Sequence, residues 1–308
     1  MAVFTAILAA AGLYIPLMQF VVFFVWTIPS VLVIVRHGLM TGLVSLTAAT
    51  LLIFMLAGPV SAIMAAIQIG SLAVIYGIAF RRGWKAGAAL FSGAAIMMVS
   101  TLLLYYLVFI ITGINNLDIA SQLQEALEPT IQMYKDIGLI NPEKGVTEEG
   151  VRQIMQGYFQ SFTFFFPGMF ALSGAVSAFL TFFASQKILR RFQIEINSLP
   201  PFRLWRLPWW IIWGLIAGLI CNVGGMHWGM ETLSKIGSNI VIIYVVVLFV
   251  LGLSTLCFFL RKYLGEDLVS RVMLPLIIFF LAPYSVITLA VVGLVDLFFN
   301  YRRFSGVT

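Results

Sequence analysis

Residues 86–112 read AGAALFSGAAIMMVSTLLLYYLVFIIT, and this stretch decides the fold class. It contains no charged residue and no proline from its first residue to its last. A helix needs about 20 apolar residues to cross the hydrocarbon core of a bilayer. The stretch therefore predicts a transmembrane α-helix.

The composition of the whole chain agrees with a membrane location. Of the 308 residues, 61% are hydrophobic and only 10% are charged, and the mean hydropathy is +1.05. A soluble domain carries about 25% charged residues. A water-soluble fold of this size cannot bury so much apolar surface, so lipid must surround most of the chain.

Apolar stretches of this kind recur along the sequence. Residues 2–35 are too long for one span and predict two short helices that meet near Tyr14–Gln19. Further spans are expected at 39–57, 60–80, 86–112, 157–186, 208–225 and 237–260. The last stretch, 272–300, contains Pro275 and Pro283, so it forms either one long tilted helix or two short ones hinged near Ala282–Pro283. The sequence predicts an all-α polytopic transmembrane bundle of about 8–10 spans.

The distribution of lysine and arginine predicts the orientation. Basic residues follow every second span, whereas the segment 113–156 contains seven acids and three bases. The positive-inside rule therefore places the basic loops in the cytoplasm and 113–156 outside the cell membrane. A cytoplasmic Arg302–Arg303 end requires an even number of spans, which favours ten with a hairpin over 272–300.

A polar linker divides the chain into two membrane parts. We expect a six-span membrane domain at 1–193, a cytoplasmic interfacial linker at 194–207 and C-terminal membrane helices at 208–308. The linker region NSLPPFRLWRLP (197–208) contains three prolines and cannot form a regular helix. Its aromatic and basic residues suit a membrane interface.

The outer segment 113–156 has helical patterning of its own. Apolar residues recur at helical spacing after Ser121, which is expected to be the N-cap, and Thr147 resembles a second helix start. The apolar positions are Leu123, Leu127, Ile131 and Tyr134. Two short amphipathic helices over the outer mouth of the bundle are expected.

Uncharged polar side chains gather in the outer half of the first six predicted spans. The residues are Gln19, Gln68, Tyr105, Tyr106 and Gln160. Amides and phenols are costly in lipid and should turn inward. They predict a cavity, covered by the 113–156 segment, for a small neutral or zwitterionic molecule. Hydrogen bonding between helices is the alternative explanation.

Small residues and one acid form further candidates. Ala2, Ala6 and Ala10 are spaced for close approach of another helix, so they predict a docking face; the alternative is the ordinary abundance of alanine in membrane helices. Asp296 is an acid within an apolar run and a candidate for an intramembrane charge. Pairing with a nearby arginine is the simpler interpretation of Asp296.

Several functional classes are excluded or unsupported by the sequence. There is no HExxH, GxSxG or Walker A motif, so an enzyme is not expected. Cys221 and Cys257 lie in apolar runs without the spacing of a metal or redox site, so neither a metal nor a cofactor is expected. The basic residues lie in short loops between spans, which argues against binding to nucleic acid. The apolar start runs on to Arg36 without a preceding basic region, so no cleavable secretion signal is expected.

Several motifs resemble one bacterial family. The turn at Arg36–Gly38, the PPFRLWRLP segment and the ending GLVDLFFNYRRF are similar to the YybS family of predicted membrane proteins of unknown function. The first six spans are in turn similar to the S-components of energy-coupling-factor transporters, which capture substrates. That resemblance implies that Ala2, Ala6 and Ala10 dock a coupling subunit. S-components lack the long outer segment and the C-terminal spans.

Three functions stay open from the sequence. The first is a substrate-capture or transport subunit, and the second is a non-catalytic scaffold or regulatory subunit that docks other membrane proteins. The third is an enzyme or lipid-handling protein. A ligand cavity in the first six spans favours the first, and a fully packed interior favours the second.

Overall fold

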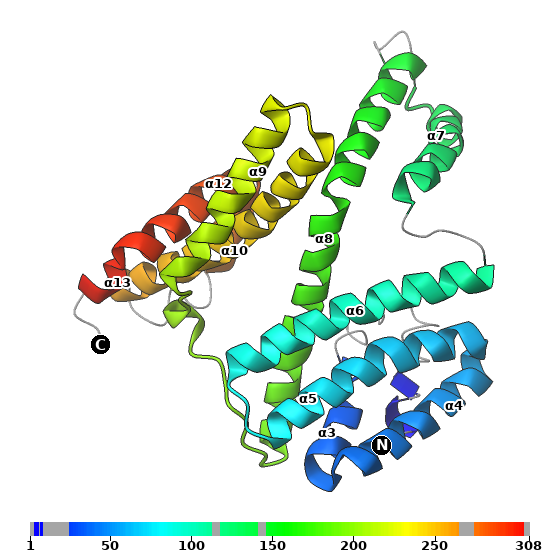
Figure 1. Ribbon diagram of the computed structural model, residues 1–308, viewed down its shortest axis with the longest axis vertical. Coiled ribbons are helices and arrows are strands. Elements are labelled where there is room, and N and C mark those ends of the chain that lie inside the picture. The colour runs from blue at the N-terminus through cyan, green and yellow to red at the C-terminus, as the bar shows by residue number, and fades with distance from the viewer. Residues whose placement is uncertain are drawn as a thin grey trace. The chain divides into compact units, whose positions relative to one another are not determined.

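The computed structural model describes residues 3–5, 7–8, 25–112, 118–140, 146–264 and 274–304. Within these ranges the regular elements are helices, and no β-strand is present. The all-α class predicted from the composition is therefore confirmed. Figure 1 shows the elements in chain order.

Five of the described helical segments are long and apolar enough to cross a membrane. They are Leu39–Arg81, Ala86–Ile111, Glu148–Arg191, Trp209–His227 and Glu231–Lys262. Two shorter apolar helices are Ile28–His37 and Val286–Phe299. The chain is thus an integral membrane protein with several spanning helices.

The chain divides into two compact units. The first contains residues 1–126 and 170–198, and the second contains residues 127–169 and 199–308. The segment 127–169 therefore clusters with the C-terminal helices, whereas the sequence grouped it with the first six spans.

The first unit is built around helices α3 to α6. These are α3 (Ile28–His37), α4 (Leu39–Ala65), the π-helical turn η1 (Ala66–Gly70), α5 (Ser71–Arg81) and α6 (Ala86–Thr112). The break between the predicted spans 39–57 and 60–80 falls at Gly58, whose φ of 82° and ψ of 176° are not helical. Glycine adopts this conformation without steric cost, and Pro59 cannot continue the preceding ladder.

Close helix packing in the first unit depends on small residues. A Cβ atom at Gly42 or Gly77 would overlap the side chain of Ile34, so these two glycines let α3 lie against α4 and α5. The buried Tyr76 ring packs beside Gly93, and its hydroxyl donates a hydrogen bond to the carbonyl oxygen of Ala178 at 2.6 Å. The absence of a side chain at Gly42, Gly77 and Gly93 therefore allows the close approach of helices in this unit.

The basic turns of the first unit meet at one end. The Arg36 guanidinium donates to the carbonyl oxygen of Phe192 at 3.1 Å and lies over the Phe192 ring. Asn197 donates to the carbonyl oxygens of Gly83 at 2.8 Å and Trp84 at 3.1 Å. The loops after the second, fourth and sixth predicted spans therefore lie together, as the charge alternation requires. Which side of the membrane they face stays a prediction.

The outer segment contains one helix of its own and the start of another. Helix α7 (Ile119–Asp136) begins after Asp118, whose carboxylate accepts a hydrogen bond from the backbone N–H of Ser121 at 3.2 Å. The predicted N-cap at Ser121 is therefore wrong, because the more N-terminal Asp118 occupies that role. Leu127 and Ile131 are buried, which agrees with the predicted apolar face of α7.

The second predicted outer helix is not short. Thr147 caps it as expected, with its hydroxyl oxygen accepting from the N–H of Gly150 at 3.2 Å. The helix that starts there, α8, runs without interruption from Glu148 to Arg191 over 44 residues. At 1.5 Å per residue, α8 is roughly 66 Å long, about twice the thickness of a hydrocarbon core.

The second unit contains the C-terminal helices. They are η3 (Phe202–Leu204), η4 (Trp209–Ile211), α9 (Ile212–His227), α10 (Glu231–Leu264), α12 (Leu274–Phe299) and α13 (Tyr301–Phe304). Residues 192–211 contain only two short 3-10 turns, which confirms that the proline-rich linker is irregular. Within the last apolar stretch, residues Leu274–Phe299 form one helix, α12, so the preferred hairpin near Ala282–Pro283 is not observed.

Glycines also bring α9, α10 and α12 together. A Cβ at Gly237 would meet the backbone of Gly218 and Asn222 on α9, and a Cβ at Gly252 would meet the backbone of Leu289 on α12. In lipid, such close approach replaces the hydrophobic drive that pairs helices in water. Figure 1 shows α9, α10 and α12 side by side.

Candidate functional site

The side chains that the sequence assigned to one ligand cavity have different surroundings where the structure describes them. Gln19 lies outside the described residues. Gln68 is half-buried in η1 and lines a small cavity of about 10 Å³, which is large enough for about one water molecule. The Tyr105 ring packs 5.8 Å from the Phe170 ring. Tyr106 is 60% exposed, and Gln160 is exposed on α8. A cavity shared by all five stays a prediction.

The alanine stripe of the first predicted helix, Ala2, Ala6 and Ala10, lies outside the described residues. Thr5, beside them in the sequence, is 1% exposed, whereas Phe4 is 55% exposed. The docking role of this stripe stays a prediction.

A groove of about 520 Å³ lies beside the π-helical turn in the first unit. It is lined by α4, η1, α5 and α6 through Leu43, Leu46, Thr47, Thr50, Leu51, Ala66, Gly70, Ser71, Val74, Ile75 and Ile96. The polar side chains among them carry hydroxyl groups only, and none is ionisable. The volume falls within the range of small-molecule sites.

Two hydroxyl groups of the groove, those of Thr47 and Ser71, already have hydrogen bonds. The Thr47 hydroxyl donates to the carbonyl oxygen of Leu43 at 3.0 Å. The Ser71 hydroxyl lies 3.4 Å from the carbonyl oxygen of Gln68 and accepts from the Ser100 hydroxyl at 2.7 Å. Each hydroxyl oxygen has two acceptor lone pairs, so both can still accept a further hydrogen bond.

A second candidate lies in the C-terminal unit, where Arg302 is buried with Asp296. Arg302 is 1% exposed and Asp296 is 7% exposed. Nε and Nη2 of Arg302 lie 3.0 Å and 2.9 Å from Oδ2 of Asp296. The simpler interpretation of Asp296, pairing with a nearby arginine, is therefore confirmed.

Burial lowers the pKa of the Arg302 guanidinium, and the Asp296 carboxylate opposes that shift. The guanidinium nevertheless stays charged, because an arginine does not lose its proton in a protein.

Arg302 also binds two other segments of this unit. Nη1 donates to the carbonyl oxygen of Arg203 at 2.7 Å and to the Ser254 hydroxyl at 3.0 Å. Nη2 donates to the Thr255 hydroxyl at 2.7 Å. All three nitrogen atoms of Arg302 thus donate to protein acceptors. The residue joins α13 to the linker, to α10 and to α12.

The turn between α12 and α13 makes this pairing geometrically feasible. Asn300 has a φ of 50°, in the left-handed region that asparagine tolerates better than most residues. Its N–H donates to the carbonyl oxygen of Asp296 at 2.9 Å and ends α12. The backbone turns at Asn300, and the side chain of Arg302, two residues later, reaches the Asp296 carboxylate. Oδ1 of Asp296 is buried without a hydrogen-bond partner among the described residues.

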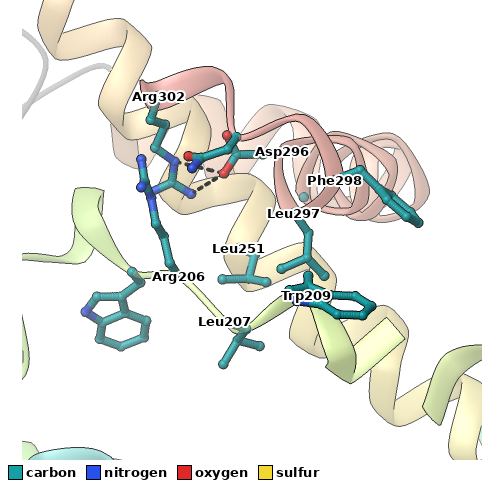
Figure 2. Close-up of a pocket in the computed structure, with 11 residues that line it drawn as sticks. Arg206, Leu207, Trp209, Leu251, Asp296, Leu297, Phe298 and Arg302 are labelled. Atoms are coloured by element: carbon teal, nitrogen blue, oxygen red, sulfur yellow. Dashed lines mark hydrogen bonds and ion pairs between the residues drawn. The ribbon is translucent and has the colours of Figure 1, made fainter. Parts of the chain in front are cut away.

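A cavity of about 330 Å³ adjoins this cluster (Figure 2). Its polar lining consists of Arg206, Asp296, Asn300 and Arg302. The rest of its lining is mostly apolar and aromatic: Trp205, Leu207, Trp209, Leu251, Gly293, Leu297 and Phe298. The site can therefore accept a molecule with one polar and one apolar part.

Of the residues in this cluster, only Asp296 stands out in the sequence, because it is charged within an apolar run. Ser254 and Thr255 carried no signal, because small hydroxyl residues are frequent in membrane helices. The Arg203 carbonyl belongs to the backbone, so no side-chain pattern reports it.

Comparison with known proteins places the chain in a family. The family model described as "Predicted membrane protein (DUF2232)" matches residues 3–297. The chain belongs to this family. This DUF2232 member is also 24% identical over 299 residues to the "Uncharacterized protein YybS" of Bacillus subtilis (strain 168), covering 97% of this chain and 94% of that protein. The resemblance to YybS-like proteins is thus confirmed. No solved structure matches this DUF2232 chain.

Proposed function

We propose that this DUF2232 membrane protein is a substrate-capture or transport subunit that binds a small uncharged molecule in the groove beside η1. The observation that supports this most is the groove itself, with a volume of about 520 Å³ and hydroxyl groups as its polar side chains. A charged ligand would require a counter-charge, which the groove does not offer. The ligand is therefore mainly apolar, with at least one hydrogen-bond donor for Ser71 or Thr47.

The π-helical turn supports this choice of groove. Single π-helical turns inside α-helices occur frequently at functional sites. Gly70 ends this turn and lines the groove, and a Cβ added there would meet nothing within 4 Å. Its φ of −61° and ψ of −49° suit any L-residue. The absence of a side chain at Gly70 thus leaves open space that a ligand can occupy.

The test is to fill the groove at Gly70. In the variant Gly70→Leu, the new side chain should occupy the groove without straining the backbone. Gly87→Leu is the matched control, because Gly87 lies in α6, does not line the groove and likewise has nothing within 4 Å of an added Cβ. Purified wild-type protein and both variants are extracted, and small molecules are compared by mass spectrometry. A molecule that is retained by the wild type and Gly87→Leu, and is lost from Gly70→Leu, supports the proposal.

The opposite result has a clear meaning. Equal small-molecule content in all three proteins, with both variants folded, contradicts capture in this groove. The scaffold or regulatory function then becomes the better explanation. The exposure of Tyr106 and Gln160 favours that second candidate, because side chains expected in a cavity are on the surface. Co-purification of other membrane proteins with wild type and Gly70→Leu alike would support it.

A further inference from the structure

We propose that the cavity beside Arg206 in the C-terminal unit binds the head group of an anionic phospholipid, with an acyl chain along its apolar wall. This site is separate from the groove beside η1, and the inference goes beyond the proposed function. It rests on the charge of the cavity, on its two-part lining and on its aromatic surroundings.

The charge of the cavity comes from Arg206. Asp296 and Arg302 form a pair, and all three nitrogen atoms of Arg302 donate to protein acceptors. Arg206 is exposed and makes no hydrogen bond or ion pair with the residues that the structure describes. The lining therefore has one positive charge without a described partner. Electrostatic repulsion from Arg206 also acts on Arg302, so an anion between the two would relieve it.

The lining separates into a polar and an apolar part. Figure 2 shows Arg302 bonded to Asp296 on one side, and Leu297 and Leu251 between that pair and Trp209. A guanidinium binds a phosphate with two parallel hydrogen bonds. Leucine and tryptophan side chains gain by covering a hydrocarbon chain. A free phosphate ion would use only the first part, whereas a phospholipid would use both.

The aromatic surroundings are those of a membrane interface. Trp209, Trp210 and Trp213 follow the linker and are 66%, 60% and 63% exposed. Tryptophan is enriched at the level of lipid head groups. Basic pockets between helices at the inner surface are known to suit anionic head groups. The occupant is therefore a lipid of the leaflet in which the linker lies.

The experiment titrates the full-length protein in detergent with phosphatidylglycerol or phosphatidylcholine and measures bound lipid by native mass spectrometry. The variant Arg206→Gln removes the charge, and Arg206→Lys retains it. Arg82→Gln is the control, because Arg82 is an exposed arginine of the other unit that loses the same charge. We expect the wild type to prefer phosphatidylglycerol. That preference should fall roughly tenfold in Arg206→Gln, because a charge-assisted hydrogen bond is lost. It should stay within about threefold of wild type in Arg206→Lys and unchanged in Arg82→Gln.

Three results would overturn the proposal. The first is an unchanged lipid preference in a folded Arg206→Gln protein. The second is an equal loss in Arg82→Gln, which would show that only total charge matters. The third is displacement of phosphatidylglycerol by millimolar inorganic phosphate, which would show that the site takes a free anion. These variants do not alter the groove beside η1. A failure of the lipid proposal therefore does not contradict the capture proposal, which the Gly70→Leu variant tests.

Discussion

The side-chain amide of Asn239 bonds two backbone groups of α8, at Gly168 and Phe164. Its Oδ1 accepts from the N–H of Gly168 at 2.7 Å, and its Nδ2 donates to the carbonyl oxygen of Phe164 at 2.9 Å. Pro167, one residue before Gly168, has no backbone N–H to bond the carbonyl oxygen of Thr163, so α8 lacks one hydrogen bond beside this contact. This arrangement joins α8 and α10 within the second unit.

Asn239→Leu should destabilise the protein by about 1–3 kcal/mol, because it removes two hydrogen bonds to the backbone of α8, each worth about 0.5–1.5 kcal/mol. The free energy of unfolding is measured in mixed micelles by denaturant titration. Ser161→Ala is the control, because its exposed hydroxyl bonds only the carbonyl of its own helix at Gly157. A loss for Asn239→Leu no larger than that of Ser161→Ala would show that the amide bridge contributes little.

Removal of Arg302 should cost more than removal of the whole pair. Arg302→Met leaves the buried Asp296 carboxylate without its partner, at about 3–5 kcal/mol. The double variant Asp296→Leu, Arg302→Met removes both charges and should recover part of that loss. A double-mutant cycle of unfolding free energies measures the coupling. Additive effects of the two substitutions would contradict a direct energetic interaction.

Acidification should loosen the outer helix α7. The Arg152 guanidinium bonds to the Glu128 carboxylate, with Nη2 3.1 Å from Oε2, and holds the pKa of Glu128 below its usual range. A carboxyl whose folded pKa is depressed stabilises the folded state above its unfolded pKa of about 4.3. That contribution is lost as the pH falls through the lower folded value. Proteolysis within 119–136 by an acid-active protease should therefore accelerate as the pH falls from about 5 to about 3.

The variant Glu128→Gln separates this ion pair from general acid effects. It should show faster cleavage of α7 already at pH 5 and a weaker dependence on pH. Glu125→Gln removes an exposed acid of the same helix that has no ion pair among the described residues, so it should behave like wild type. Parallel pH profiles for all three proteins would exclude a role for the Glu128–Arg152 pair.

The orientation in the membrane can be tested with single cysteines. Ser121→Cys and Ser198→Cys are made in a background in which Cys221 and Cys257 are replaced by alanine. Both serines are exposed, so each new thiol is accessible to reagent on its own side. A membrane-impermeant maleimide should label Ser121→Cys in intact cells and Ser198→Cys only after permeabilisation. Labelling of Ser198→Cys in intact cells would reverse or refute the predicted topology.

Local patterns predicted the individual helices well. The span 86–112 was expected from its uninterrupted apolar sequence, and α6 is Ala86–Thr112. The N-cap of α7 was misassigned, because Asp118 and Ser121 are both good capping residues and sequence does not show which carbonyl begins the helix. The length of α8 was underestimated, because the polar residues of 148–156 are compatible with helix outside the membrane. The last stretch was expected to be a hairpin because a cytoplasmic Arg302–Arg303 end requires an even number of spans. It contains a single helix, Leu274–Phe299, and a membrane helix tolerates proline where neighbouring groups satisfy the freed carbonyl.

The sequence by itself determined that this protein lies in a membrane, that its spans are helices and where its charged loops fall. These properties follow from hydropathy and from the need to satisfy every backbone hydrogen bond in lipid, and both act along the chain. Only the tertiary structure decided that Asn239 meets Gly168, that Arg302 binds Arg203, Ser254, Thr255 and Asp296, and that Arg206 lines a cavity. Those contacts join residues up to 99 positions apart. They depend on how glycine-lined helices pack, and no local pattern of residues reports that packing.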